Sequence, residues 1–365
     1  MKKNLSSFLS IKKTLIDAKK KKKFIIFWGA GPNVNQFIKT YVNKYKLISE
    51  PYGILETTKN IDKKKKFLGK YKYLSPKDLS KFPSDRTLII ITAGLLDLYS
   101  EIVKNKLFYF NIIHKKSIEF YHYFKSKNKI INQNLSYLDD KKSKFIYLQK
   151  LNNIISGNFV DTNIYSSCQY LNNDLIQNGK KIKKIIYAGA FDGYNMDRFL
   201  KLNKKIIINA FEPSSKMYRF LKNKYKKNND IKIFNSLLWS QNDLDIRFND
   251  DSKNEGLSAS VINSASLGST YKVKTFKIDN LIDKFRADMI ALDVEGSELK
   301  ALDGAKKYIN KHKPILGICI YHNAYDYAQI IKTLYLNYKQ YYKFYIRQHS
   351  VISYIETVLY CIPKK

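Results

Sequence analysis

Five short, almost entirely apolar runs recur through the second half of the chain. They are KIIYAG, KIIINAFEP, IKIFNSLLW, ADMIALDVEG and PILGICIYH, which begin at residues 184, 205, 231, 287 and 314. Strands that are apolar at nearly every position are typical of a parallel sheet covered on both faces. Their alternation with helical stretches predicts an α/β fold, and the two final runs, KFYIRQHS and ETVLYCIP, suit an antiparallel edge hairpin.

A similar alternation begins near the amino terminus, where the run KFIIF at residues 23–27 leads into the glycine turn of WGAGP and a helical stretch. Further strands are expected at residues 52–55 and 88–92, followed by a helix at residues 95–106. Ser75 and Pro76 have the residue types of a helix start, a capping serine followed by proline in the first turn. The first part of the chain therefore predicts a second, small Rossmann-like α/β domain.

These patterns divide the 365 residues, which are enough for two hydrophobic cores, into four segments. We predict a basic leader at 1–22, the small Rossmann-like domain at 23–127, a helical connector at 128–180 and the larger α/β domain at 181–365. The connector contains the segment SYLDDKKSKFIYLQKLNNIISGNF, which is expected to form one amphipathic helix. Its apolar face is predicted from near-helical spacing of Leu138, Phe145, Leu148, Leu151 and Ile155.

The formal net charge of +35 comes almost entirely from lysine, with only six arginines in the chain. Bidentate recognition of phosphate and guanine favours arginine, so nucleic acid is a disfavoured partner. A biased residue composition is the favoured explanation of this charge. The alternative is an attraction to anionic glycans, lipid-linked phosphates or an anionic membrane surface. The three scattered cysteines and the interrupted apolar residues at the start predict a cytoplasmic protein, with a peripheral position at the inner membrane face as the alternative.

A glycine turn follows the run that begins at residue 184. Gly189, Ala190 and Gly193 let the backbone turn tightly against a ligand. Glu212 ends the next run, at the sheet edge where an acid can hold ribose hydroxyls. Asp192 lies inside the turn and would repel a dinucleotide pyrophosphate, whereas the sulfonium and amino groups of S-adenosylmethionine attract an acid. The turn and Glu212 therefore predict a site for an adenosine-type ligand, and Asp192 favours S-adenosylmethionine.

A second group of polar residues ends the two following runs. Asp293 and Glu295 follow one strand and His322 ends the next, so all three should converge on one cleft beside the cofactor. Methyl transfer to an alcohol needs in-line approach and a base for the hydroxyl proton. His322 is the expected base, because its ordinary pKa lies near neutrality, and Asp293 is expected to orient the acceptor. The same three residues are ligand types for a divalent metal, but the spacing is not diagnostic and no metal is predicted.

The motifs YAGAFDGYN, AFEPSSKMYRFLK, DMIALDVEGSELKALDGA and KPILGICIYHNAYDY resemble the FkbM family of methyltransferases, together with YIRQHS and ETVLYCIP. They cover residues 158–363. The resemblance implies a class I, seven-stranded methyltransferase fold, S-adenosylmethionine as donor, and O-methylation, often of sugars in surface polysaccharides such as capsule or lipopolysaccharide. It also implies cofactor contacts at Gly189, Asp192, Gly193 and Glu212, an acceptor-facing set of Asp293, Glu295 and His322, and an adenine contact at Trp239 and Ser240.

Two other enzyme classes remain as alternatives. An RNA methyltransferase is disfavoured by the scarcity of arginine and by the absence of an Asn-Pro-Pro-Tyr type motif. An NAD-dependent sugar-nucleotide oxidoreductase would use the first glycine turn, in which Val34 replaces the third glycine. The amino-terminal domain is similar to small Rossmann-like domains found beside glycan-modifying enzymes, so nucleotide-sugar binding and partner docking are both hypotheses for it.

Overall fold

The computed structural model divides into two compact units, one of residues 1–125 and 151–158, the other of residues 126–150 and 159–365. Most of the segment that was predicted as a helical connector thus groups with the second unit. The described residues are 5–29, 33–56, 71–92, 110–158, 160–172, 174–176, 182–249, 260–261, 270–352 and 354–364. The helix predicted at residues 95–106 lies outside them.

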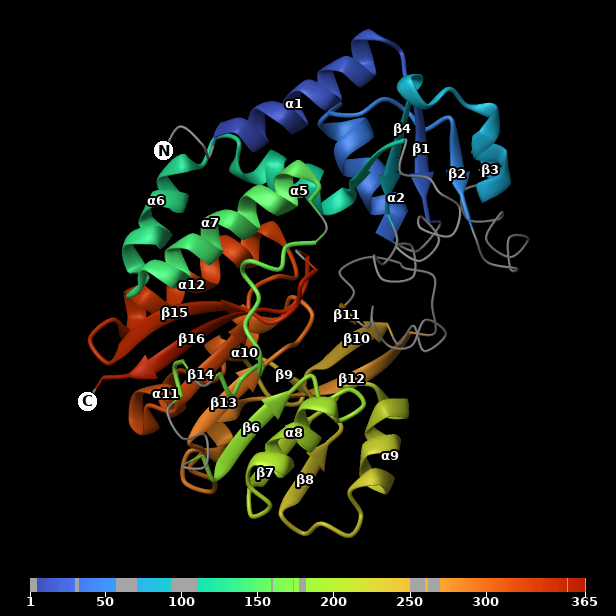
Figure 1. The fold of residues 1–365 in the computed structure, drawn as a ribbon. Coiled ribbons are helices and arrows are strands. Elements are labelled where there is room, and N and C mark those ends of the chain that lie inside the picture. The colour runs from blue at the N-terminus through green and yellow to red at the C-terminus, as the bar shows by residue number, and fades with distance from the viewer. Residues whose placement is uncertain are drawn as a thin grey trace. The chain divides into compact units, whose positions relative to one another are not determined.

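The first unit contains a fully parallel sheet in the order β3-β2-β1-β4-β5 (Figure 1). The three predicted strands are present as β1 (Phe24–Trp28), β2 (Gly53–Leu55) and β4 (Thr87–Ile91). Sequence reasoning missed β3 (Lys72–Leu74) and β5 (Asn111–His114), which are short edge strands with exposed residues. Because β1 and β4 are almost completely buried, their sequences are continuous apolar runs, whereas the partly exposed edge strands have no such pattern.

Helices surround this first sheet. They are α1 (Leu5–Lys20), α2 (Asn33–Phe37) with its π-helical continuation η2 (Ile38–Lys44), the 3-10 helices η3 (Pro76–Lys81) and η4 (Ser84–Arg86), and α5 (Lys115–Phe124). The predicted helix start at Ser75 is confirmed, since the Asp78 carboxylate accepts hydrogen bonds from the Ser75 amide and hydroxyl, both at 2.8 Å. Asp78 thereby fixes the first turn of η3.

The second unit is built on a seven-stranded sheet in the order β15-β16-β14-β13-β6-β7-β8. Its strands are β6 (Lys184–Ala188), β7 (Ile207–Phe211), β8 (Ile231–Phe234), β13 (Met289–Leu292), β14 (Ile315–Cys319), β15 (Tyr342–Gln348) and β16 (Thr357–Pro363). The first five run parallel to one another. The antiparallel hairpin of β15 and β16 is confirmed, and β16 rather than β15 joins the parallel strands.

Alternate residues of these strands build a core on one face of the sheet. Ile185 and Tyr187 of β6 and Met289 and Ala291 of β13 belong to one buried cluster, as the two-residue period of a strand requires. The covering residues come from α8 (Tyr194–Leu202), α9 (Ser215–Lys224) and the segment around Tyr170. Further helical elements of this unit are η8 (Ile278–Leu281), α10 (Glu298–Asp303), α11 (Lys306–His312) and α12 (Ala324–Tyr338).

The predicted strand at residues 231–239 is wrong in one respect, because it is two strands in two sheets. β8 ends at Phe234, and β9 (Leu237–Leu238) joins a second sheet in the order β11-β10-β12-β9. The other strands of this sheet are β10 (Asp245–Asn249), β11 (Ser260–Val261) and β12 (Thr270–Phe276). The Asn235 side chain donates to the carbonyls of Glu212 and Pro213 at 2.9 and 3.1 Å, which ties the break to the end of β7.

The amphipathic segment of the predicted connector also differs from its prediction. It is divided between α6 (Asn128–Tyr137) and α7 (Lys141–Ser156), because Asp140 starts a new helix by accepting a 2.6 Å hydrogen bond from the Ser143 amide. Phe145, expected on the apolar face, is 53% exposed, whereas Lys150 is fully buried. Among the described residues, no helix combines the length and apolar character needed to cross a membrane.

Arg347 anchors α7 to the sheet of the second unit. Its side chain is 3% exposed, and Nη2 lies 2.8 Å from the Asp140 carboxylate while Nη1 donates to the Ser143 hydroxyl at 3.0 Å. We therefore expect Arg347→Leu to lower the free energy of unfolding by about 2 kcal/mol, since it removes charge-assisted hydrogen bonds and leaves Asp140 without its partner. Chemical denaturation measures the change. Arg286→Leu, at an exposed position, is the control, and equal midpoints for the two variants would contradict the assignment.

Candidate functional site

The strand order brings the sequence-predicted residues to one edge of the seven-stranded sheet. The carboxyl ends of β7, β6, β13 and β14 lie at this edge, followed by Glu212, Gly189, Asp293 and Tyr321 respectively. β16 runs antiparallel to β14, so the same edge holds its beginning, where Glu356 precedes Thr357. Sequence reasoning expected the ends of these four parallel strands to converge here, and the hairpin adds a fifth strand end that it did not consider.

A cavity of about 490 Å³ opens at this edge. Five carboxylates and one guanidinium are among its lining side chains, so its charge is opposite to that of the chain as a whole. The charged lining residues are Asp192, Arg198, Glu212, Asp293, Glu295 and Glu356. Of the remaining predicted cofactor contacts, Gly189 and Ala190 also line the cavity, whereas Gly193 does not.

The glycine turn is required by close backbone approach. Gly189 has φ 80°, and a Cβ atom there would lie 1.8 Å from the carbonyl oxygen of Asp293. Gly193, at the start of α8, has φ 81°, and its Cβ would lie 2.5 Å from the Tyr225 hydroxyl. The two glycines therefore have different tasks, since Gly189 lets β6 approach the end of β13 while Gly193 lets α8 begin against Tyr225.

Glu212 joins the two sides of the glycine turn. It is 5% exposed, and its carboxylate accepts hydrogen bonds from the backbone amides of Phe191 at 2.7 Å and Ser214 at 2.8 Å. Each of the two carboxylate oxygens accepts one of these bonds. Because a carboxylate has about four acceptor positions, Glu212 can accept further hydrogen bonds from a ligand. The arrangement suits a group with two adjacent hydroxyls held at the end of β7.

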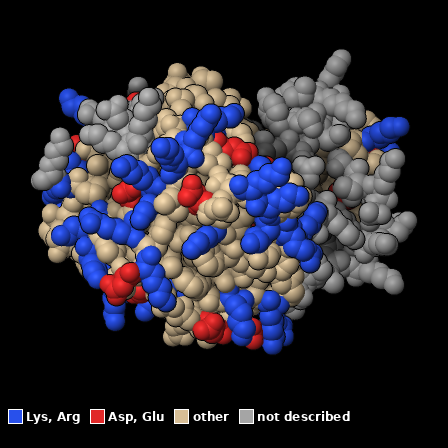
Figure 2. Space-filling view, turned by 90° about the horizontal axis from the view of Figure 1, so that it is seen from below, with Lys and Arg blue, Asp and Glu red and all other residues tan. Residues whose placement is uncertain are grey.

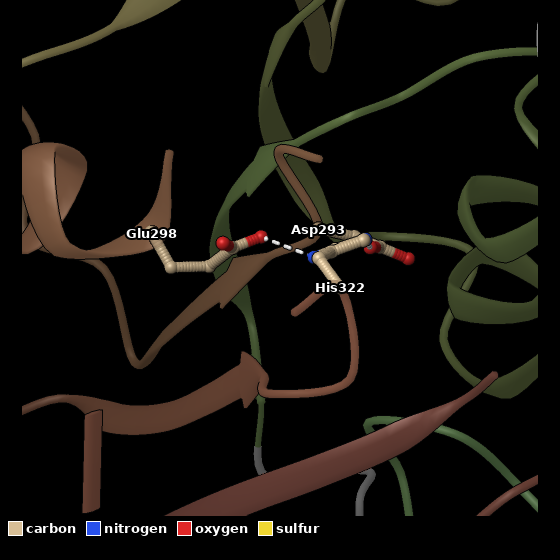
Figure 3. A group of neighbouring side chains, drawn as sticks. All are labelled: Asp293, Glu298 and His322. Atoms are coloured by element: carbon tan, nitrogen blue, oxygen red, sulfur yellow. Dashed lines mark ion pairs between the residues drawn. The ribbon is translucent and has the colours of Figure 1, made fainter. Parts of the chain in front are cut away.

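His322 lies among three carboxylates, and Figure 3 draws two of them, Asp293 and Glu298. Its Nδ1 is 3.0 Å from Glu298, and its Nε2 is 3.1 Å from Asp293 and 3.6 Å from Glu295. The imidazole is 8% exposed and is not among the residues that line the cavity. The structure thus brings the three predicted acceptor-side residues together, but only Asp293 and Glu295 reach the cavity itself.

The protonation of His322 differs from the expectation of a neutral base. Burial alone lowers the pKa of His322, but the charges of Glu298 and Glu295 and the contact with Asp293 outweigh it and raise the pKa well above 6.5. At neutral pH the ring is therefore an imidazolium and holds no lone pair that could accept a proton. The His322 imidazolium therefore offsets the negative charge of the neighbouring carboxylates and does not act as the base.

Glu298, the first residue of α10, is held from two sides. It is fully buried, and its Oε1 accepts a 2.9 Å hydrogen bond from the Val294 amide in addition to its contact with His322. Asp293, Glu298 and His322 each offer one ligand atom, all within 4.8 Å of one another, which is a spacing that a divalent cation could use. In the structure, a protonated imidazole supplies positive charge between these carboxylates.

Trp239 and Ser240, the predicted adenine contacts, are not among the residues that line the cavity. Trp239 lies beyond the break at Asn235, and its carbonyl packs so closely on Gly304 that an added Cβ would be 1.9 Å away. Its ring faces Lys300, whose Nζ is 5.9 Å from the ring centroid. Leu237 and Phe248 line the cavity instead, so apolar contact is offered by the second sheet.

Glu356 was not singled out by sequence reasoning. It lines the cavity beside Asp293, and its backbone has φ 58° and accepts a 2.8 Å hydrogen bond from the His349 amide. Burial and the charge of Asp293 raise the pKa of Glu356 to about 7. A carboxyl group with this pKa changes protonation near neutral pH, which is what a general base requires.

His349 is the second residue that was missed. Its Nδ1 donates to the Ser166 carbonyl at 2.8 Å, and its Nε2 accepts from the Tyr360 hydroxyl at 2.8 Å. Burial lowers the pKa of His349 to about 4, so the ring is neutral at physiological pH. Sequence reasoning could have found both residues from the predicted hairpin, because its turn had to lie at one end of the sheet. Which end this is became known only with the strand order.

The ion cluster generates a prediction for His322→Gln. Loss of the imidazolium leaves Glu298 and Asp293 facing each other without a cation, so the free energy of unfolding should fall by about 3–5 kcal/mol at pH 6. The wild-type pKa is raised on folding, so this stabilisation is fully present below pH 6.5 and is lost as pH rises through the folded pKa. Denaturation curves from pH 6 to 10 measure it, and a difference that grows with pH would contradict the assignment.

Comparison with known proteins agrees with this architecture. Residues 188–344 match the family model of the methyltransferase FkbM domain, which confirms the resemblance found in the motifs. The matched range includes Gly189, Glu212, Asp293 and His322, and it ends before Glu356. A search of curated proteins finds no matching relative.

Among solved structures, methyltransferase FkbM from Methylobacillus flagellatus KT matches with a TM-score of 0.62 at 15% identity, covering 98% of this chain and 99% of that chain. This likeness confirms the predicted fold. Aeropyrum pernix fibrillarin in complex with S-adenosyl-L-methionine has a TM-score of 0.34 at 10% identity, with 51% of this chain and 68% of that chain covered. A putative caffeoyl-CoA O-methyltransferase from Staphylococcus aureus also has a TM-score of 0.34, at 14% identity, with 65% and 99% covered.

Proposed function

We propose that the second unit transfers a methyl group from S-adenosylmethionine to a sugar hydroxyl. The proposal rests on the fact that three acids from different strands line one cavity. Glu212 follows β7, Asp293 follows β13, and Glu356 precedes β16. A volume of about 490 Å³ lies within the range of small-molecule sites, about 300–1,000 Å³. The cavity therefore has room for a nucleoside donor and carboxylates on both sides of it.

The donor is held by its ribose and by its positive charges. Glu212 accepts the ribose hydroxyls, and Leu237 and Phe248 provide apolar contact for the adenine. S-adenosylmethionine carries a sulfonium and an ammonium group, and the carboxylates of Asp192, Asp293 and Glu295 favour both. The same carboxylates disfavour the pyrophosphate of NAD in this cavity, whereas the oxidoreductase alternative uses the first glycine turn in the other unit.

Glu356 is the proposed base for the acceptor hydroxyl, in place of His322. The hydroxyl oxygen must approach the methyl group opposite the sulfur, and its proton must leave as the carbon–oxygen bond forms. Glu356 faces the cavity and can take that proton, while Asp293, held by the Tyr321 hydroxyl at 3.1 Å, orients the acceptor. His322 acts as a positioning cation, because it lowers the repulsion between Asp293 and Glu298.

A sugar acceptor in surface polysaccharide synthesis is supported by the character of the cavity wall and of the protein surface. Gln169, Tyr194 and Asn195 line the cavity and are hydrogen-bonding partners for a polyhydroxylated ligand. Figure 2 shows Lys and Arg side chains spread over one face with few acids among them, a surface that would attract anionic glycans, lipid-linked phosphates or an anionic membrane. A cytoplasmic site of action follows from this proposal. RNA is the less favoured acceptor, because the cavity itself repels phosphate.

Glu212→Gln tests the donor site. The neutral amide loses the charge-assisted bonds to the ribose, so the dissociation constant for S-adenosylmethionine should rise at least about tenfold. Isothermal titration calorimetry measures it. Asp230→Asn, at an exposed position after α9, is the matched control and should leave binding unchanged. The donor proposal fails if the wild type binds NAD but no S-adenosylmethionine.

Glu356→Gln tests the base. Wild-type methyl transfer should rise as pH passes through about 7, since the pKa of Glu356 is raised to about 7 and only the carboxylate accepts a proton. The variant should lose this rise and about 10²–10⁴-fold in turnover, while it keeps its affinity for the donor. Incorporation of labelled methyl groups into surface glycan from pH 5.5 to 9 is the measurement. An unchanged pH profile in the variant would rule out Glu356 as the base.

The acceptor class is tested by offering the labelled donor to surface glycan and to total RNA in parallel. We expect label in the glycan, because phosphates are repelled by the carboxylates of the cavity. Wild type, Glu356→Gln and a heat-treated sample should be compared in both pools. Label that enters RNA alone would overturn the sugar proposal while leaving methyl transfer itself intact.

A further inference from the structure

Arg198 is the one Lys or Arg among the described residues that line the cavity. It lies on α8, five residues after Gly193 of the glycine turn, and is half-buried. Its guanidinium stands 5.6 Å from the ring centroid of Tyr194, a contact that holds the side chain against the helix surface. The buried arginine of this unit, Arg347, is paired with Asp140, whereas the described ion pairs include none for Arg198.

Asn195, three residues before Arg198 on α8, and His349 are neutral polar residues of the same cavity lining. The Asn195 amide donates to the side chains of Gln169 and Tyr187, both at 3.2 Å. His349 carries no charge at physiological pH, and the guanidinium of Arg198 is one of the causes that lower its pKa. Arg198 therefore places a positive charge at the cavity, and the ion pairs of the described residues do not include it.

We infer that Arg198 binds a carboxylate group of a ligand in this cavity. The inference rests on the proposed function and names a subsite within it. A guanidinium presents two parallel N–H groups that match a carboxylate, and such pairs are short and strong. A phosphate carries more negative charge and would meet five carboxylates for one guanidinium, so a singly charged carboxylate is the better match.

Two ligands could supply this carboxylate. The first is the methionyl end of S-adenosylmethionine, whose ammonium and sulfonium groups suit the acids of the cavity while its carboxylate needs a cation. The second is the carboxylate of a uronic acid in the acceptor. In both cases the ligand bears a carboxylate that would otherwise be repelled by Asp192 and Glu356, and Arg198 supplies the compensating charge.

The first arm of the test compares two adenosine ligands by calorimetry. S-adenosylhomocysteine carries the amino-acid carboxylate, and 5′-methylthioadenosine lacks the whole amino-acid end. If the donor supplies the carboxylate, Arg198→Gln should weaken S-adenosylhomocysteine at least about tenfold and leave 5′-methylthioadenosine unchanged. Arg198→Lys should recover part of the loss, because it keeps the charge without the bidentate geometry.

The second arm measures glucuronate and glucose binding to the protein saturated with S-adenosylhomocysteine, by saturation-transfer NMR. If the acceptor supplies the carboxylate, Arg198→Gln should abolish the preference for glucuronate and leave S-adenosylhomocysteine binding intact. Arg219→Gln, exposed on α9, is the matched control in both arms. Equal binding of every ligand by wild type and Arg198→Gln would overturn the inference. A wild type that binds neither adenosine ligand would overturn the proposed function as well, so the two failures are distinguishable.

Discussion

The close approach of β6 to the end of β13 is the constraint on which the site depends. The backbone of Gly189 lies so near the Asp293 carbonyl that no side chain fits between them. Because these strands are neighbours in the sheet, the glycine turn and the acidic end of β13 share one cavity. Glu212 then fixes the turn through the Phe191 amide, so a nucleoside bound there would present its reactive end to Asp293.

Charge separates the inside of the site from the rest of the protein. The chain is strongly basic, yet its cavity is lined mainly by carboxylates, and a further acid, Glu298, is fully buried behind them. Such a cluster is stable only if positive charge is built in, and His322 supplies it as an imidazolium. The cavity can therefore attract a sulfonium ion without the carboxylates forcing one another apart.

The sequence was informative wherever burial alone determined the structure. Apolar runs located the strands, and the positions of Glu212 and Asp293 followed because parallel strands end at one edge. The role of His322 could not be derived in this way, since its pKa depends on Glu298, which no spacing rule placed beside it. Trp239 is not among the cavity-lining residues because the Asn235 hydrogen bonds divert the chain, and Glu356 was missed because the position of β16 in the sheet is set by tertiary pairing.

A crystal structure of the full chain with S-adenosylhomocysteine would show directly where the nucleoside binds. We expect both ribose hydroxyls to lie within hydrogen-bonding distance of Glu212 and the sulfur to face the space between Asp293 and Glu356. The ligand would then span the sheet edge from β7 toward β16. Density for the ligand only at the first glycine turn, near Gly29, or with its ribose away from Glu212, would contradict the central claim.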